Sequence, residues 1–198
     1  MSAAAFRWFT AGAITEDELR AACGLHARAF PRPGRTVDDV VASRRAVWTG
    51  DGGAVVPGPL VSTTPPSRVA VIDGDGVWRA NAATITRQIA TPAGPMVVLG
   101  LLDVATHPDD RGRGLGAAVV RAAWGPVDRG ELPACLFQTG DAQPFYEKLG
   151  ARVVDNRFVD STGATPADAP VFEDTYTMIY PADASWPAGE IDTLGPGY

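Results

Sequence analysis

Residues 104–117 read VATHPDDRGRGLGA, a stretch in which an apolar run ends in an Arg/Gly-rich turn and a helical pattern begins. The alternate glycines Gly112, Gly114 and Gly116 leave the backbone of the turn free of Cβ atoms. Successive N–H groups can therefore close around phosphate oxygens at the helix N-terminus, where the helix dipole also favours negative charge. The two arginines of the turn add cations that suit a pyrophosphate. The stretch predicts an anion-binding loop between a strand and a helix.

Two common phosphate-binding loops fit this stretch poorly. A Walker loop ends in Gly-Lys-Ser/Thr, but the only lysine of the sequence is Lys148, far downstream. The spacing of Gly112, Gly114 and Ala117 formally satisfies the dinucleotide fingerprint. That fingerprint also needs an acidic residue at the end of the next strand, whereas the next apolar run, 134–137, is followed by Gln and Thr. We therefore interpret the dinucleotide match as accidental.

The chain resembles the GNAT superfamily of acyl-CoA-dependent N-acetyltransferases. The family signature Arg/Gln-x-x-Gly-x-Gly/Ala is matched by Arg111, Gly114 and Gly116, and the run 142–151, AQPFYEKLGA, is similar to the closing helix and turn of the family. The resemblance is specific over 99–151. The C-terminal stretch weakly resembles that of the aminoglycoside 2'-N-acetyltransferases within the superfamily.

The resemblance implies an α/β (α+β) fold with a mixed, mostly antiparallel sheet flanked by helices on both faces. We expect a single N-acetyltransferase domain over 1–198, with core motifs in 96–151 and a C-terminal packing segment at 181–198. The residue patterns predict two capped helices, then strands, the loop helix, the short helix of the second motif and a final antiparallel pair. The expected ranges are strands 6–10, 68–72, 77–91, 96–106 and 134–137, helices after Thr15 and Thr36, an inward stripe of Leu115, Ala118, Val119 and Ala122, and the pair 153–159 with 172–180.

The resemblance further implies acetyl-CoA as the acyl donor. The run 104–106 is expected to pair with the pantetheine like an added strand and to offer a backbone N–H to the thioester oxygen. Thr139 stands where the family often has an asparagine that bonds the pantetheine. The expected cofactor-binding residues are Val104, Ala105, Thr106, Arg111, Gly112, Arg113, Gly114, Leu115, Gly116, Ala117 and Thr139.

Tyr146 is the expected general acid, because a phenol with a pKa near 10 is protonated at neutral pH and can protonate the leaving thiolate. The alternative for Tyr146 is an aromatic packing residue. Asp103 is the expected base, since an acid in an apolar strand is costly unless it is paired or reactive. It could instead bond Arg87, Arg111 or a backbone amide. The two histidines lack metal-ligand spacing, so no metal site is expected.

Composition bounds the class of protein. The apolar fraction of 45% and charged fraction of 20% suit one folded domain. An isoelectric point near 4.8 argues against a nucleic-acid partner. No apolar run approaches the length of a membrane span, so we expect no membrane partner. The two cysteines lack metal or disulfide spacing, which favours reduced thiols, and we expect a cytoplasmic location. The run 155–198 has eight acidic residues against Arg157 alone, either a solvated surface or a wall that attracts cationic amines.

These observations favour transfer of an acetyl group from acetyl-CoA to a primary amine of a small molecule, an amino sugar among the expected acceptors. The amine would attack directly in a ternary complex. One alternative is a protein or peptide N-acetyltransferase, and another is a non-catalytic acyl-CoA-binding module. The resemblance also implies a homodimer through 172–180.

Overall fold

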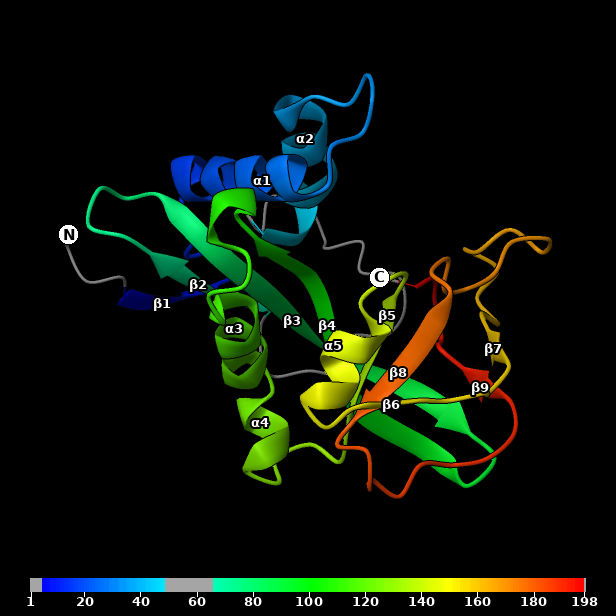
Figure 1. Cartoon of the computed structure of the whole chain (residues 1–198). Coiled ribbons are helices and arrows are strands. Elements are labelled where there is room, and N and C mark those ends of the chain that lie inside the picture. Colours follow the sequence, from blue (N-terminus) through cyan, green and yellow to red (C-terminus); the bar gives the residue numbers. More distant parts are fainter. Residues whose placement is uncertain (1–4, 49–65, 198) are drawn as a thin grey trace. The chain divides into compact units, whose positions relative to one another are not determined.

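The structure, a computed structural model, describes residues 5–48 and 66–197. Its described residues form two compact units (Figure 1), the first from 5–48, 66–84 and 102–123 and the second from 85–101 and 124–197. The long strands β3 (Trp78–Thr91) and β4 (Gly94–Thr106) contribute residues to both units.

Three strands of the first unit follow one another along the chain. β1 (Ala5–Thr10) pairs antiparallel with β2 (Ser67–Ile72), which pairs antiparallel with β3. The turn between β2 and β3 forms as expected: Gly76 has φ 80°, and the Asp73 carboxylate accepts the N–H groups of Asp75 and Val77 at 3.0 and 2.9 Å. Of the predicted loop over 52–67, the part up to residue 65 lies outside the described residues.

The two N-terminal helices begin at side-chain caps. In α1 (Glu16–Ala29) the Thr15 hydroxyl accepts from the Glu18 N–H at 3.2 Å, while the Glu18 carboxylate accepts from the Thr15 N–H at 2.9 Å. Thr36 and Asp39 make the same reciprocal bonds at the start of α2 (Val37–Trp48). Each cap satisfies amide groups that would otherwise lack a helical partner, which confirms the two predicted starts.

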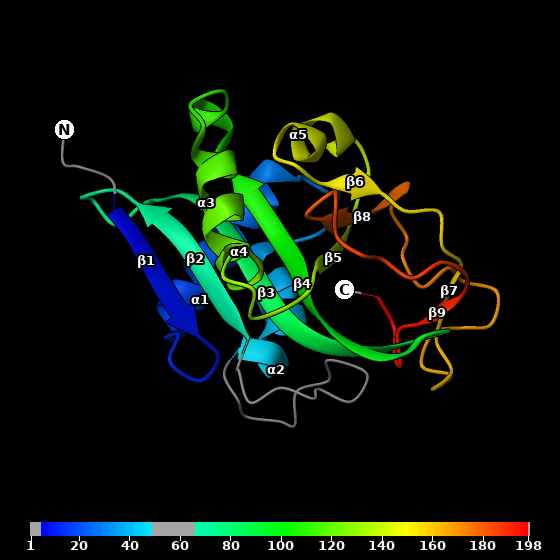
Figure 2. The same cartoon turned by 90° about the horizontal axis from the view of Figure 1, so that it is seen from below.

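In the first unit, helices lie on both faces of the strands. α1 and α2 form one apolar cluster with Ala70 and Ile72 of β2. The helix α3 (Leu115–Ala123) also contacts β2, and Figures 1 and 2 show it on the face opposite to α1. Since successive residues of a strand point to opposite faces, Val69 and Val71 are buried on the side of β2 away from α1 and α2.

The inward stripe of α3 differs from the predicted one. Its buried residues are Val119, Val120 and Ala123, whereas Leu115, Ala118 and Ala122 are only partly buried. The helix is apolar on nearly every side, so several stripes fit the pattern equally well and the sequence does not select one. The helix ends at Ala123, and Gly125 and Pro126 open the short helix α4 (Gly125–Asp128).

The second unit holds the late strands. β5 (Cys135–Thr139) pairs in parallel with β4 and antiparallel with β8 (Tyr176–Tyr180), which also pairs antiparallel with β6 (Arg152–Val153). The helix α5 (Gln143–Lys148) precedes Gly150, whose φ is 100°. Both edges of β8 are thus occupied within the chain. The dimer expected through 172–180 stays a prediction, and within this range β8 already pairs with β5 over its whole length and with β6 at Met178 and Ile179.

The predicted strand 153–159 is wrong as a single element. Its first residue lies in β6, whereas β7 (Phe158–Val159) pairs in parallel with β9 (Ile191–Asp192), a strand that the sequence patterns did not predict. The sheet remains mixed and mostly antiparallel, as expected, because only the β4–β5 and β7–β9 pairs are parallel.

The C-terminal segment of the second unit is held by a buried arginine. Arg87, 1% exposed, donates to the carbonyl oxygens of Thr193 and Pro196 at 2.7 and 2.5 Å. Ile191 is fully buried with Ile89, Leu136 and Ile179 in one apolar cluster. In the described part of the chain, no helix is long and apolar enough to cross a membrane.

Candidate functional site

A buried carboxylate anchors the loop between β4 and α3. The short 3-10 turn η1 (Pro108–Asp110) follows β4 and ends at Asp110, whose side chain is 5% exposed. This carboxylate forms ion pairs with Arg79 of β3, at 3.2 Å, and with Arg113. The start of the loop is thereby tied to the neighbouring strand.

Two glycines determine the conformation of this loop. Gly112 and Gly114 have φ values of 76° and 78°, in the left-handed region that a Cβ disfavours. Glycine is favoured at these two positions because of the backbone conformation and not for lack of space, since a Cβ at either position would meet no atom within 4 Å. The Ala118 N–H makes a helical bond of 3.0 Å to the Gly114 oxygen. The amides of 115–117 precede that donor, so they leave the start of α3 able to bind an anion.

The two arginines of the loop have different partners. Arg111 donates from Nη2 to the carbonyl oxygen of Ala29, the last residue of α1, at 3.0 Å. Because a carbonyl oxygen has no net charge, this bond does not neutralise the positive charge of the Arg111 guanidinium. Arg113 is 61% exposed and pairs with Asp110. Arg111 therefore has the less compensated charge of the two.

The last residues of β4 lead directly into the loop. Ala105 is buried at 2% exposure, whereas Val104 and Thr106 are partly exposed. The next residue, His107, donates its N–H to the Arg79 oxygen at 2.8 Å. The end of β4 is thus held on its β3 side by the same arginine residue that binds Asp110.

Asp103 lies at an irregular point of β4. Its φ is 52°, a left-handed conformation that costs a non-glycine residue about 1 kcal/mol and is typical of a bulge. The side chain is only 6% exposed and accepts from Arg44 at 2.7 Å and from Arg68 at 2.9 Å. Its backbone oxygen accepts from the Asn81 amide at 2.7 Å. The alternative considered from the sequence, that Asp103 is a paired acid, is thus observed, although its partners are Arg44 and Arg68 and not Arg87 or Arg111.

The Arg68 side chain links this carboxylate to the interior of the first unit. Arg68 is 2% exposed, donates to the Asn81 amide oxygen at 2.7 Å, and lies over the Trp48 ring at 4.7 Å from the centroid. Burial alone would raise the pKa of Asp103, but the charges of Arg68 and Arg44 outweigh burial and lower it to about 2. A carboxylate with so low a pKa is a weak base, which weighs against the expected role in deprotonation.

Tyr146 packs among aromatic rings of the second unit. It is 6% exposed, with ring centroids of Phe137 at 4.7 Å, Phe145 at 5.0 Å and Trp124 at 6.5 Å. Burial raises its pKa above the ordinary value of 10, so the phenol is protonated at neutral pH. Both sequence interpretations of Tyr146 are compatible with this packing, because the ring fills the core and the hydroxyl remains a possible proton donor.

The expected site residues divide between the two units. Asp103, the end of β4 and the loop residues to Ala117 belong to the first unit, and Thr139 and Tyr146 belong to the second. Thr139 is 7% exposed at the end of β5, opposite Tyr176 of β8.

Sequence reasoning missed the polar residues around Asp103, which are Arg44, Arg68 and Asn81. The available signal was Arg68 and Asn81 in otherwise apolar strands, since a buried polar side chain needs a partner. Among the described residues, no group of three His, Cys, Asp or Glu side chains could hold a metal ion.

No protein-family model matches the sequence. Several solved structures are similar to the chain as a fold. The GNAT family N-acetyltransferase YhbS of Escherichia coli, solved in complex with CoA, aligns with a TM-score of 0.62 over 98% of this chain and 91% of its own, at 14% identity.

A GNAT family acetyltransferase of Staphylococcus aureus Mu50 aligns with a TM-score of 0.55 over 90% of this chain and 99% of its own, at 12% identity. Glucosamine-6-phosphate N-acetyltransferase of Arabidopsis thaliana aligns with a TM-score of 0.51 over 74% of this chain and 90% of its own, at 13% identity. The chain therefore has the GNAT N-acetyltransferase fold.

Proposed function

We propose that the protein is an N-acetyltransferase that transfers an acetyl group from acetyl-CoA to a primary amine of a small molecule. The observation that carries this proposal is the loop of Gly112 and Gly114, which opens the N-terminus of α3 directly after β4 in a chain with the GNAT fold. The alignment over 98% of the chain supports one N-acetyltransferase domain over 1–198.

The residues of the loop fit the diphosphate of acetyl-CoA. The amides of 115–117 would donate to phosphate oxygens, and Arg111 and Arg113 would supply positive charge. The backbone of 104–106 would pair with the pantetheine, and Thr139 would bond it through its hydroxyl. When bound, acetyl-CoA supplies the acetyl group as a thioester.

Tyr146 is the proposed general acid. The raised pKa keeps its proton at neutral pH, so the phenol can donate to the sulfur as negative charge develops there. The aromatic packing of its ring would hold the hydroxyl in one orientation, which favours transfer to a fixed atom.

For Asp103, the bonds to Arg44 and Arg68 support a positioning role rather than that of the base. The acceptor ammonium, with a pKa near 10, must lose a proton before the amine attacks. A carboxylate with a pKa of about 2 takes that proton poorly, so the base that we propose is water or a residue other than Asp103.

Amino sugars remain among the proposed acceptors, and the fold of an N-acetyltransferase whose name specifies glucosamine 6-phosphate supports including them. Cys23 and Cys135 are free and buried, which supports the cytoplasm as the proposed location. The homodimer through 172–180 remains part of the proposal.

The test combines acetyl-CoA binding by calorimetry with thiol release across aminoglycosides, polyamines, amino acids and short peptides. We expect binding by the wild type, turnover of one small-amine class, and about tenfold weaker binding in Arg111→Ala/Arg113→Ala. Arg121→Ala, at an exposed position of α3, is the matched control.

Three results would contradict the proposal. Unchanged affinity in the double variant would remove the loop as the binding site. Turnover of peptides alone would favour the peptide N-acetyltransferase. Tight binding without turnover of any amine would favour the non-catalytic acyl-CoA-binding module.

A further inference from the structure

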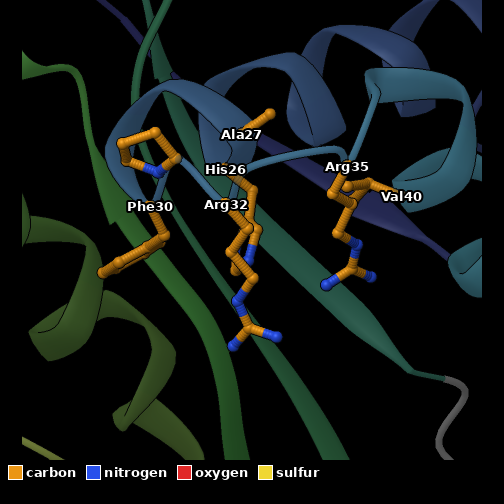
Figure 3. A pocket seen from close by; sticks show the side chains of 7 residues that line it. His26, Ala27, Phe30, Arg32, Arg35 and Val40 are labelled. Carbon is orange, nitrogen blue, oxygen red and sulfur yellow. The ribbon is translucent and has the colours of Figure 1, made fainter.

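The first unit contains a small pocket between the end of α1 and the start of α2. Its volume is about 120 Å³. Figure 3 shows the Arg32 and Arg35 side chains extending in the same direction from the segment that joins the helices, with Phe30 to one side. The main lining residues are His26, Phe30, Pro31, Arg32, Arg35 and Val40.

The pocket is positively charged in a chain whose net charge is −6. Its lining includes Arg32 and Arg35 and has no acidic side chain. Several other arginines of this unit are paired with carboxylates, such as Arg20 with Asp38 at 2.6 Å. Within 5–48 and 66–197 neither pocket arginine forms an ion pair within 4.0 Å, and the Arg35 guanidinium bonds the Ser43 hydroxyl at 3.4 Å. The Asp39 carboxylate still interacts with Arg35 through its charge. Two guanidinium groups on one pocket, neither held in an ion pair, favour an anion.

A tight turn holds the two arginines close together. The Arg35 N–H donates to the Arg32 oxygen at 3.2 Å, and Gly34 has φ 77°. Pro33 in the second position and glycine with positive φ in the third are the pattern of a type II turn. The proline and the turn bond limit the backbone, so less conformational entropy is lost when both guanidinium groups bind one ligand.

The inner end of the pocket leads towards Asp103. A second cavity of about 10 Å³, room for about one water molecule, shares His26 and Val40 with the pocket and is also lined by Asp103. The Nδ1 atom of His26 is buried and has no hydrogen-bond partner among the described residues. Burial lowers the pKa of His26, so its imidazole is neutral at pH 7. His26 therefore contributes a neutral polar group, and no positive charge, to the inner wall of the pocket.

The pocket also adjoins the loop proposed to hold acetyl-CoA. Arg111 of that loop donates to the Ala29 oxygen, and the next residue, Phe30, lines the pocket. Asp103, at the inner cavity, directly precedes the 104–106 run proposed to face the thioester. A ligand with its charged end at Arg32 and Arg35 would therefore extend towards the proposed reaction centre.

The volume limits what the pocket can hold. Sites for whole drug-sized ligands measure about 300–1,000 Å³. A pocket of about 120 Å³ suits one end group, such as a carboxylate or a phosphate, and not a nucleotide cofactor. Because the diphosphate of acetyl-CoA is already assigned to the loop before α3, we assign the anion of this pocket to the acceptor.

We propose that this pocket binds the anionic group of the acceptor, and that the substrates of the enzyme are small amines carrying a carboxylate or a phosphate. Arg32 and Arg35 are the specificity-determining residues. The inference rests on the proposed acetyl transfer and assigns its acceptor class.

The test uses pairs of amines that differ in the anionic group, 2-aminoethyl phosphate against ethanolamine and a set of amino acids against their carboxamides. We expect the anionic member of at least one pair to have the higher kcat/KM in the thiol-release assay. Arg32→Ala/Arg35→Ala should lower that value about tenfold or more and remove the preference. Both residues are exposed, so the variant should fold, and Arg28→Ala, an exposed change on α1, should keep the preference.

Acetyl-CoA binding, measured by calorimetry on the same proteins, separates the outcomes. If Arg32→Ala/Arg35→Ala weakens acetyl-CoA binding by the same factor as it lowers kcat/KM, the pocket holds a phosphate of CoA. That result would overturn the inference. A preference for neutral or cationic amines, or one that survives the double substitution, would also overturn it while leaving acetyl transfer intact. No binding of acetyl-CoA by the wild type would refute the proposed function itself.

Discussion

Replacing Asp103 by asparagine tests how far the charged cluster stabilises the first unit. The substitution keeps the shape of the side chain and removes the negative charge shared by Arg44 and Arg68. Arg68 is 2% exposed and cannot recover hydration, whereas Arg44 is 35% exposed and can do so in part. Asp103→Asn therefore leaves one buried guanidinium without its counterion.

Two estimates give the range in which the loss of unfolding free energy in Asp103→Asn should fall. A carboxyl whose pKa falls from 3.8 to about 2 on folding stabilises the native state by about 2 kcal/mol at neutral pH. Removal of one partner from a buried ion pair costs about 3–5 kcal/mol, because the remaining charge stays buried. Since Arg44 is partly hydrated, we expect Asp103→Asn to lower the free energy of unfolding by about 3 kcal/mol.

The assay is urea unfolding of the wild type and the variant at several pH values, with Asp75→Asn at an exposed turn position as the control. The pKa of Asp103 is lower in the folded protein, so its stabilisation is present above pH 4 and is lost as the pH falls towards 2. The difference between wild type and Asp103→Asn should therefore narrow below pH 4. A difference under about 1 kcal/mol at pH 7 that does not change with pH would refute this reasoning.

Two further predictions concern the proposed reaction. Tyr146→Phe keeps the contact with Phe137 and removes only the hydroxyl, so thiol release should fall about 100-fold with unchanged acetyl-CoA affinity by calorimetry. An unaltered rate would exclude Tyr146 as the acid. Gly112→Ala places a Cβ at φ 76°, which should distort the loop and weaken acetyl-CoA binding. Gly24→Ala, in open space on α1, is its control, and equal affinity in both variants would contradict the loop assignment.

The elements that the sequence predicted well depend on short-range chemistry. The capping box of Thr15 and Glu18 and the turn that ends at Gly76 involve residues at most four positions apart. Their bonds do not depend on how distant segments pack, so the residue types alone indicate them. The strand, loop and helix order around 104–117 was predicted for the same reason.

The elements that were predicted wrongly depend on distant partners. The run 153–159 has the alternation of one strand, but its two ends pair with β8 and β9. Likewise, the partners considered for Asp103 as an alternative to the base role were Arg87, Arg111 or a backbone amide, while its partners Arg44 and Arg68 lie 59 and 35 residues away. Spacing along the chain contains no information on such pairs. The sequence could show only that a buried acid needs a cation.

Net charge and local charge lead to opposite expectations for the acceptor. The acidic run 155–198 suggested a wall that attracts cationic amines, an argument that uses the summed charge of a segment. Surface charges are screened over about 8 Å at physiological ionic strength, so the summed charge of a segment is a weak guide to what a ligand meets in its pocket. Guanidinium groups that line the pocket act at hydrogen-bond distance and with fixed direction. Arg32 and Arg35 should therefore decide which amines are accepted, and the acidic segment should at most affect their rate of encounter.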